Sequence, residues 1–291
     1  MKKVFGALAA AAMTVLIAVS FAACGGNQVK IVEIDLSTEQ YGIAVKKGDT
    51  KMKEDVNGVL EKLKGDGVTV YGKTVTFNSL YTAEMEAQEK GELISIGEVK
   101  TKSSDRTKEL VVATNAEFAP FEYMVGESFG GIDMQVAKII AAELGKELVV
   151  LHMSFEVVLE AVGNTADIGM AGLTINEDRM KTVDFSAPYY DTTQRIAVLA
   201  DDTDFDGCTD EASVVKVLNE LKGAKAGAAK AQTGYFYLVG NDSFEFAGFE
   251  NIETNQYASI ALAVQDLANG KLKLVCGDKD TLSAAVKAMN K

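Results

Sequence analysis

Residues 109–123 read ELVVATNAEFAPFEY, and the region that starts here decides the fold. Its opening, ELVVAT, is a short apolar run, which is typical of a strand buried inside a sheet. Segments with apolar residues at helical spacing follow at 131–144 and 155–162, and strand-like runs at 147–152 and 167–171 alternate with them. Strands that alternate with helices predict a parallel sheet with helices on both faces.

A second unit of the same style occupies the C-terminal part of the chain. After a short helix at 176–180 and a strand at 194–199, we expect helices and strands in alternation at 213–222, 224–229, 234–239, 259–269, 272–276 and 281–289. The first third differs from both units. It contains strands at 29–34 and 41–46, helices at 51–64 and 78–88, and a polar linker, TKSSDRTK, at 101–108.

The N-terminus predicts an exported protein. Lys2 and Lys3 precede an uncharged run at 4–21, which is the pattern of a secretory signal. The sequence AACG at 22–25 resembles a bacterial lipobox, so we expect residues 1–23 to be a signal peptide and Cys24 to carry lipid. The alternative is an uncleaved membrane helix, because the apolar run is almost long enough to span a bilayer. We therefore expect the protein on the extracytoplasmic face of the cell membrane, held by its lipid anchor.

Composition excludes some classes of function. The chain has 291 residues, of which 47% are hydrophobic and 24% charged, as in a soluble globular protein. The formal charge of −13 argues against a nucleic-acid partner, because such binding needs clustered Lys and Arg. Cys208 and Cys276 have neither metal-site nor redox spacing, and in an exported protein they leave open a disulfide or two free thiols.

Several motifs between residues 114 and 190 resemble those of the solute-binding proteins of amino-acid importers. They are TNAEFAPFEY at 114–123, GIDM at 131–134, ADIGMAGLT at 166–174, NEDR at 176–179 and VDFSAPYY at 183–190, and the resemblance covers 109–291. It implies the two-lobe α/β fold of type II periplasmic binding proteins (the Venus-flytrap fold). It also implies an amino-acid ligand between the lobes, an ABC transporter permease as partner, a monomer, and no cofactor or metal.

The order of the motifs predicts a circular permutation. Members of this family end with a hinge strand of the form E-x-Y-G-I-A-V-x-K-G and a helix, but here EQYGIAVKKG occurs at 39–48, before the other motifs. Relocated termini are tolerated in exposed loops. The alternative is a separate small domain at 29–108. Under permutation, 24–38 holds the anchor, tether and one strand of lobe 2. Lobe 1 is 39–198, made of the permuted segment 39–68, a connector 69–108 and the usual N-terminal part 109–198; lobe 2 continues at 199–291.

The resemblance also implies a set of binding residues. Arg179 matches the arginine that holds the ligand carboxylate, a pairing that guanidinium makes bidentately. Ala171, Gly172 and Thr174 match positions that supply backbone N–H groups and a hydroxyl beside it. From the second lobe, Gln232 and Thr233 match a helix start that contacts the same carboxylate, although Gln232 departs from the usual Thr and Thr233 could be an ordinary helix cap.

Asp278 matches the acidic residue that holds the ligand ammonium, with Asp280 as the alternative register. Phe118 matches an aromatic that covers the ligand. Asn115 matches a position that selects the ligand side chain, and its neutral amide predicts a polar or uncharged ligand. The acidic Glu117 leaves a cationic ligand as the alternative. Phe155 fits a pocket wall or a helix core equally well.

An exported enzyme is the main alternative function, because cyclohexadienyl dehydratase-like proteins share this fold. His152 is the only histidine, and its strand context predicts a structural role. The sequence contains no Ser-His-Asp set, metal-ligand cluster or G-x-G-x-x-G motif. A ligand-sensing lipoprotein without a permease also stays open. We expect two lobes that close around one ligand about hinge strands near 41–46 and 194–199.

Overall fold

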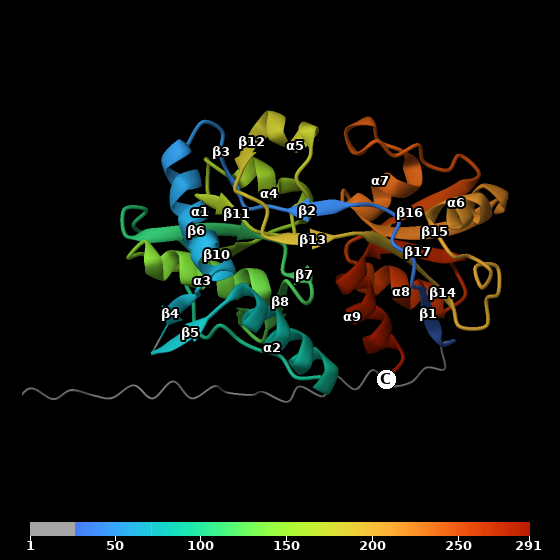
Figure 1. Ribbon diagram of the computed structural model, residues 1–291, viewed down its shortest axis with the longest axis horizontal. Coiled ribbons are helices and arrows are strands. Elements are labelled where there is room, and N and C mark those ends of the chain that lie inside the picture. Colours follow the sequence, from blue (N-terminus) through green and yellow to red (C-terminus); the bar gives the residue numbers. More distant parts are fainter. Residues whose placement is uncertain (1–26, 71) are drawn as a thin grey trace, which may run out of the picture.

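The structure, a computed structural model, describes residues 27–70 and 72–291. Figure 1 shows two lobes side by side, with the first strand lying among the elements of the C-terminal lobe. Lobe 1 comprises the described residues of 39–192, and lobe 2 comprises 27–37 together with 193–291. The predicted signal peptide and Cys24 lie outside the described residues. Among the helices that the structure describes, none is long and apolar enough to cross a membrane.

Lobe 1 is built on a five-stranded sheet in the order β10-β6-β11-β3-β12. β6 is parallel to β10 and β11, whereas β3 runs antiparallel to β11 and β12. Alternate strand residues enter two apolar clusters, with Leu110 and Val112 in one and Val111 and Ala113 in the other, so helices cover both faces. The strands are β3 (Ala44–Lys46), β6 (Glu109–Thr114), β10 (Glu147–His152), β11 (Ile168–Gly169) and β12 (Val183–Phe185), and the helices are α1 (Thr50–Lys64), α2 (Phe77–Lys90), α3 (Ile132–Glu143), α4 (Phe155–Ala161) and α5 (Glu177–Thr182).

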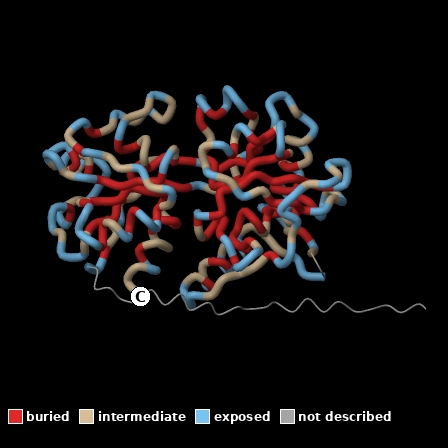
Figure 2. Tube along the Cα trace, turned by 180° about the vertical axis from the view of Figure 1, so that it is seen from behind, coloured by how far each residue is buried: buried red, intermediate tan, exposed pale blue. Residues whose placement is uncertain are grey.

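Lobe 2 repeats this architecture with a sheet in the order β1-β14-β17-β15-β16. β15 is parallel to β16 and β17, and β14 runs antiparallel to β1 and β17. The strands are β1 (Val29–Val32), β14 (Gln194–Leu199), β15 (Ala224–Ala229), β16 (Ile252–Tyr257) and β17 (Leu274–Asp278), and the helices are α6 (Glu211–Glu220), α7 (Thr233–Val239), α8 (Ile260–Ala268), α9 (Lys279–Met289) and the 3-10 helix η1 (Asp242–Phe244). Figure 2 shows that buried residues fill the interior of both lobes. The predicted two-lobe α/β architecture is confirmed.

The lobes are joined by two antiparallel strands, β2 (Glu39–Tyr41) and β13 (Tyr190–Thr192). Figure 1 shows both crossing the middle of the molecule. The predicted strand 41–46 is therefore two strands, because the chain leaves the crossing at Gly42 and enters the lobe-1 sheet at β3. The strand 194–199 was expected as a hinge at the end of lobe 1, but it pairs with β1 and β17. This strand thus belongs to the lobe-2 sheet, and the chain re-enters lobe 2 at residue 193 and not at residue 199.

The connector at 69–108 packs against lobe 1. It contains the hairpin of β4 (Val68–Val70) and β5 (Lys73–Val75) and then α2, whose N-terminus is capped by reciprocal bonds between Thr76 and Ser79. Its polar end docks onto the buried carboxylate of Glu109, which accepts hydrogen bonds from Ser103 Oγ, Ser104 N and Asp105 N at 2.8 to 3.0 Å. These bonds hold the pKa of Glu109 well below its usual range. The small sheet of β7 (Glu117–Phe118), β8 (Glu122–Val125) and β9 (Ser128–Gly130) lies between this connector and α3.

The two ends of the described chain meet in lobe 2. The Asn290 side chain pairs with the backbone of Val29, accepting from its N–H at 3.0 Å and donating to its carbonyl at 2.7 Å. Cys208 and Cys276 are free thiols, so the disulfide that the sequence left open is not formed. Cys276 is buried in β17 and Cys208 packs against the same apolar cluster.

Candidate functional site

A small pocket lies where the two lobes meet. Phe118, Phe155, Gly172 and Arg179 line it from lobe 1, and Gln232, Thr233 and Asp278 line it from lobe 2. Its volume is only about 10 Å³, so the lobes are closed upon one another here. Six of the nine predicted ligand-binding residues, together with Phe155, therefore come together at one point, although they lie far apart in the sequence.

Arg179 is held by the end of the loop that precedes it. Asn176 caps α5, and its side-chain oxygen accepts from the Arg179 backbone N–H at 2.7 Å. The guanidinium donates through Nη1 to the Thr174 carbonyl at 2.7 Å. The side chain is 9% exposed, and burial lowers the pKa of Arg179 to about 10, which still leaves it charged at neutral pH.

Asp278 presents a carboxylate from lobe 2. It is the last residue of β17, and its Oδ1 accepts from the hydroxyl of Tyr41, on a crossing strand, at 2.6 Å. Burial, together with the nearby Glu39, raises the pKa of Asp278 from 3.8 to about 7. Asp280, the alternative register, does not line the pocket; its carboxylate accepts from the hydroxyl groups of Tyr81 and Tyr190.

Glu39 is a second buried carboxylate that sequence reasoning missed. It starts β2, and its oxygens accept from Ser37 Oγ at 2.6 Å, Gln194 Nε2 at 3.0 Å and Thr174 Oγ1 at 2.9 Å. The signal was present, since Glu39 opens the EQYGIAVKKG motif. The role of Glu39 became apparent only in the structure, where the crossing strand β2 places it near Asp278.

The remaining predicted residues surround these charges. Thr174 Oγ1 lies 3.2 Å from Thr233 Oγ1, which is a direct contact between the lobes. Gln232, and not Thr233, is the N-cap residue of α7, and its side chain makes no capping bond. Ala171 packs in an apolar cluster beneath the pocket. The Asn115 amide donates to the Met153 carbonyl at 2.9 Å, but its Oδ1 has no partner among the described residues.

Position 172 requires a glycine. Its φ of +54° is in the left-handed region, which favours glycine, and a Cβ here would lie 2.5 Å from Cε1 of Phe118. Its backbone N–H donates at 3.2 Å to Asp133, a buried carboxylate that also accepts from the Tyr189 hydroxyl. The ring of Phe118 therefore lies directly against the loop that carries Thr174 and Arg179.

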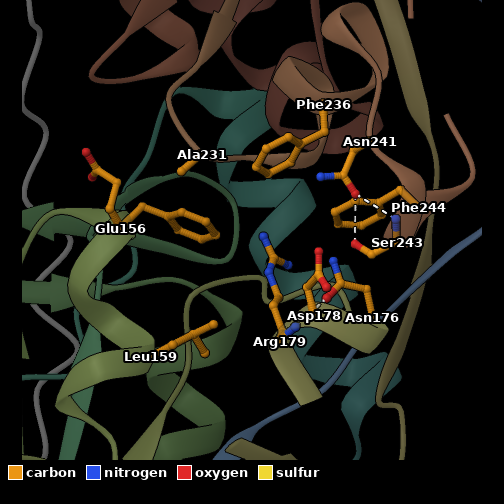
Figure 3. Close-up of a pocket in the computed structure, with 11 residues that line it drawn as sticks. Glu156, Leu159, Asn176, Asp178, Arg179, Ala231, Phe236, Asn241, Ser243 and Phe244 are labelled. Carbon is orange, nitrogen blue, oxygen red and sulfur yellow. Dashed lines mark hydrogen bonds between the residues drawn. The ribbon is translucent and has the colours of Figure 1, made fainter. Parts of the chain in front are cut away.

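A larger cavity of about 160 Å³ adjoins Arg179, and its wall again comes from both lobes (Figure 3). Arg179 points into the space between Phe236 and Phe244 of lobe 2 and the α4 and α5 residues of lobe 1, which include Leu159 and Asp178 (Figure 3). Phe244 was also missed at the sequence level, because it follows α7 in a loop without a recognisable motif.

The titratable side chains define the chemistry that the cleft can offer. The backbone N–H of Ala116 donates to Nδ1 of His152 at 3.1 Å, which is the structural role expected of that histidine. Within 27–70 and 72–291, no group of three or more His, Cys, Asp or Glu side chains is arranged to hold a metal ion. The pocket offers one guanidinium, from Arg179, and one carboxylate, from Asp278, which match the two charges of a zwitterion.

Comparisons with known proteins agree with this arrangement. A probable histidine-binding protein of Neisseria gonorrhoeae is 32% identical over 182 residues, 60% of this chain and 61% of that protein. A cyclohexadienyl dehydratase of Pseudomonas aeruginosa is 35% identical over 82 residues, 28% of this chain and 31% of the enzyme. The chain thus spans less than two thirds of either relative.

Solved structures give the same answer for the fold. The arginine-bound form of truncated ArgBP from T. maritima matches with a TM-score of 0.52 and 29% identity, over 63% of this chain and 79% of that one. The two lobes thus have the type II periplasmic-binding-protein fold. A family model also matches residues 110–290, more than half of the chain. The chain therefore belongs to the bacterial extracellular solute-binding proteins, family 3.

Proposed function

We propose that the protein captures an amino acid between its two lobes and delivers it to an ABC importer. The observation that carries this proposal is the pairing of opposite charges across the closed cleft. The Arg179 guanidinium comes from lobe 1 and the Asp278 carboxylate from lobe 2, and both line one pocket. An amino acid carries the complementary pair, an α-carboxylate and an α-ammonium, a short distance apart.

Each group of residues has a role in this proposal. Arg179 pairs with the carboxylate, and Thr174, Thr233 and the backbone N–H groups near Ala171, Gly172 and Gln232 supply further donors. Asp278 accepts from the ammonium while the Tyr41 hydroxyl keeps its carboxylate oriented. Phe118 covers the apolar part of the ligand.

The ligand side chain is proposed to be polar and rich in hydrogen-bond donors. Two buried acceptors near the cleft, Asn115 Oδ1 and Gln194 Oε1, have no donor among the described residues. Glu39 adds a second carboxylate to the site, so the balance of charge before binding is negative. This favours a side chain such as imidazole or guanidinium, in line with the ligands in the names of the matched histidine-binding protein and ArgBP. A cationic side chain departs from the polar or uncharged ligand expected from Asn115 and is the alternative that Glu117 left open.

Ligand entry requires the lobes to open. A pocket of about 10 Å³ cannot admit an amino acid, and contacts such as Lys230–Glu156 and Tyr190–Asp280 bridge the lobes. The crossing strands β2 and β13 are the natural hinge, because within residues 27–70 and 72–291 the chain passes between the lobes only there. Closure then gains energy from groups of both lobes that contact the same ligand.

We also propose that the chain is circularly permuted. The family match begins at residue 110, whereas β1, β2 and β3 at the start of the chain are integral strands of the two lobes and of the crossing. The bond pair between Asn290 and Val29 lies where the relocated termini would have to meet. Residues 69–108 then form the connector that joins the usual end of the chain to the usual start.

The proposed cellular location of the protein rests on the lipobox-like sequence at 22–25. We propose a signal peptide at 1–23 and a lipid on Cys24, which anchors the protein outside the membrane. Because β1 belongs to lobe 2, the tether would leave from that lobe. An extracytoplasmic position is consistent with the family, whose members are extracellular.

Catalysis is not part of the proposal. The matched dehydratase covers only 28% of this chain, and His152 is engaged by the backbone of Ala116. A thermal-shift screen of the mature protein against the twenty amino acids tests the function, because a ligand stabilises the folded state by mass action. A rise in melting temperature with one or a few polar amino acids is expected. Turnover of a ligand would replace the transport function with an enzymatic one, and no shift with any amino acid would contradict the proposal.

A further inference from the structure

The loop at 241–246, which we call the aromatic loop, holds Phe244 in a fixed position. Asn241 and Phe246 exchange two backbone hydrogen bonds of 2.9 and 3.0 Å, and Asn241 Oδ1 accepts from both the backbone and the hydroxyl of Ser243. The ring of Phe244 stacks on Phe236 and Phe246, with centroids 5.7 and 5.5 Å apart. These contacts hold the Phe244 ring in one orientation, so it offers a fixed face to the residue that packs against it.

That neighbour is Arg179 of lobe 1. Its guanidinium carbon lies 5.7 Å from the centroid of the Phe244 ring and 5.4 Å from that of the Phe155 ring. An aromatic ring attracts a cation through its face, and the attraction is strongest where water is excluded, as it is around this nearly buried arginine. The rings that hold Arg179 thus come from both lobes.

The ring contacts leave the edge of the guanidinium available. Arg carries five N–H donors in one plane. Among the described residues only the Thr174 carbonyl accepts from the guanidinium of Arg179. A phenylalanine ring has no oxygen or nitrogen to accept these donors, so it does not take the place of a carboxylate. Phe244 therefore fixes the arginine without occupying the donors that a ligand needs.

We infer that Phe244 is a positioning residue, which docks on Arg179 when the lobes close and holds the guanidinium in place for the ligand carboxylate. Phe155 is on lobe 1 with Arg179, so its contact can persist in the open protein. Phe244 is on lobe 2, so its contact exists only in the closed one and favours closure. The inference rests on the proposed function for its ligand, but the contact itself can be tested without one.

Arginine Nε–H signals of the ligand-free protein test the contact directly. The chain has three arginines, Arg106, Arg179 and Arg195, and Arg179→Lys identifies the signal of interest. We expect ring currents to shift the Arg179 signal in the wild type. Phe244→Leu keeps an apolar side chain without a ring and should remove the part of the shift that Phe244 causes, whereas Phe244→Tyr should retain it.

A matched control is Phe205→Leu, since Phe205 packs in the lobe-2 core and does not line the site. It should leave the Arg179 signal unchanged. The signals are also recorded with saturating unlabelled L-arginine, which should close the lobes. If Phe244→Leu leaves the Arg179 signal where it is both without and with this ligand, the closed contact does not form in solution and the inference is wrong.

Titration with L-arginine tests the consequence for binding. Phe244→Leu should weaken binding by about 5- to 30-fold, mainly through faster dissociation, while Phe244→Tyr stays within about twofold of the wild type. Phe205→Leu should bind like the wild type. Equal losses in Phe244→Leu and Phe244→Tyr would overturn the role of the ring. A wild-type protein that binds no amino acid would contradict the proposed function, while the arginine signals would still decide the contact.

Discussion

Asp278 lies buried between the lobes, where burial and Glu39 raise its pKa from 3.8 to about 7. A raised pKa means that the folded protein holds this proton more tightly than the unfolded chain. Below about pH 4 both states are protonated, and the stabilising effect of the proton is fully present. As the pH rises toward 7 the unfolded chain has already lost the proton, so the free energy of unfolding falls.

The size of this effect follows from the pKa. Each pH unit between the two pKa values costs about 1.36 kcal/mol, so the interval from pH 5 to pH 7 costs about 2.7 kcal/mol. Asp278→Asn removes the titration but retains an oxygen that can accept from Tyr41. We therefore expect the stability of Asp278→Asn relative to wild type to increase by about 2.7 kcal/mol between pH 5 and pH 8.

Urea unfolding of the ligand-free proteins at pH 5 and pH 8, followed by circular dichroism, measures this difference. Titrating groups that do not interact with Asp278, such as the buried Asp133, are common to both proteins and cancel. Asp201→Asn is the matched control, since Asp201 is exposed and should change stability equally little at both pH values. The reasoning is refuted if the stability difference between Asp278→Asn and wild type is the same at pH 5 and pH 8.

Three further predictions concern the loop, the joined termini and the anchor. Gly172→Ala should lower the affinity for the ligand by about tenfold in calorimetry, because a left-handed φ costs about 1 to 2 kcal/mol and the new Cβ displaces Phe118; wild-type affinity would contradict this. Asn290→Ala should lower the free energy of urea unfolding by about 1 to 3 kcal/mol, because it removes both bonds to Val29; an unchanged midpoint would mean that these bonds do not hold the termini. Cys24→Ser should move the protein from the membrane fraction to the soluble one in fractionated cells, and continued membrane association would argue against a lipid anchor.

Much of the fold could be predicted from local pattern. Strands β6, β10, β14 and β15 have the predicted bounds, because each is a short run of mostly apolar residues between turn signals. Strand β16 was missed, since it lies at the sheet edge and its sequence, IETNQY, is polar and only partly buried. The split of 41–46 into β2 and β3 was missed too, because the step from one sheet to the other depends on packing of Gly42 against Ile175.

The residues of the candidate site also fall into two groups, those that the sequence could predict and those that only the structure revealed. Arg179 and Gly172 stand in motifs with fixed spacing, so the family resemblance was enough to nominate them. Asp278 was matched to the family pattern outside those motifs, and the sequence left Asp280 open as the alternative register. Glu39 and Phe244 acquire their place only through tertiary structure: one from a crossing strand, the other from closure of lobe 2 onto lobe 1. No local pattern of residues predicts a contact between segments so far apart in the chain.

The central claim is that Arg179 holds the carboxylate of an amino acid in the closed cleft. Isothermal titration of wild type and Arg179→Ala tests it most directly, with the amino acid that most raises the wild-type melting temperature. We predict that Arg179→Ala loses at least about 100-fold in affinity, because truncating one partner of a buried charge pair leaves the other unpaired. Its ligand-free unfolding temperature should stay close to that of wild type. Affinity retained by Arg179→Ala would contradict the account.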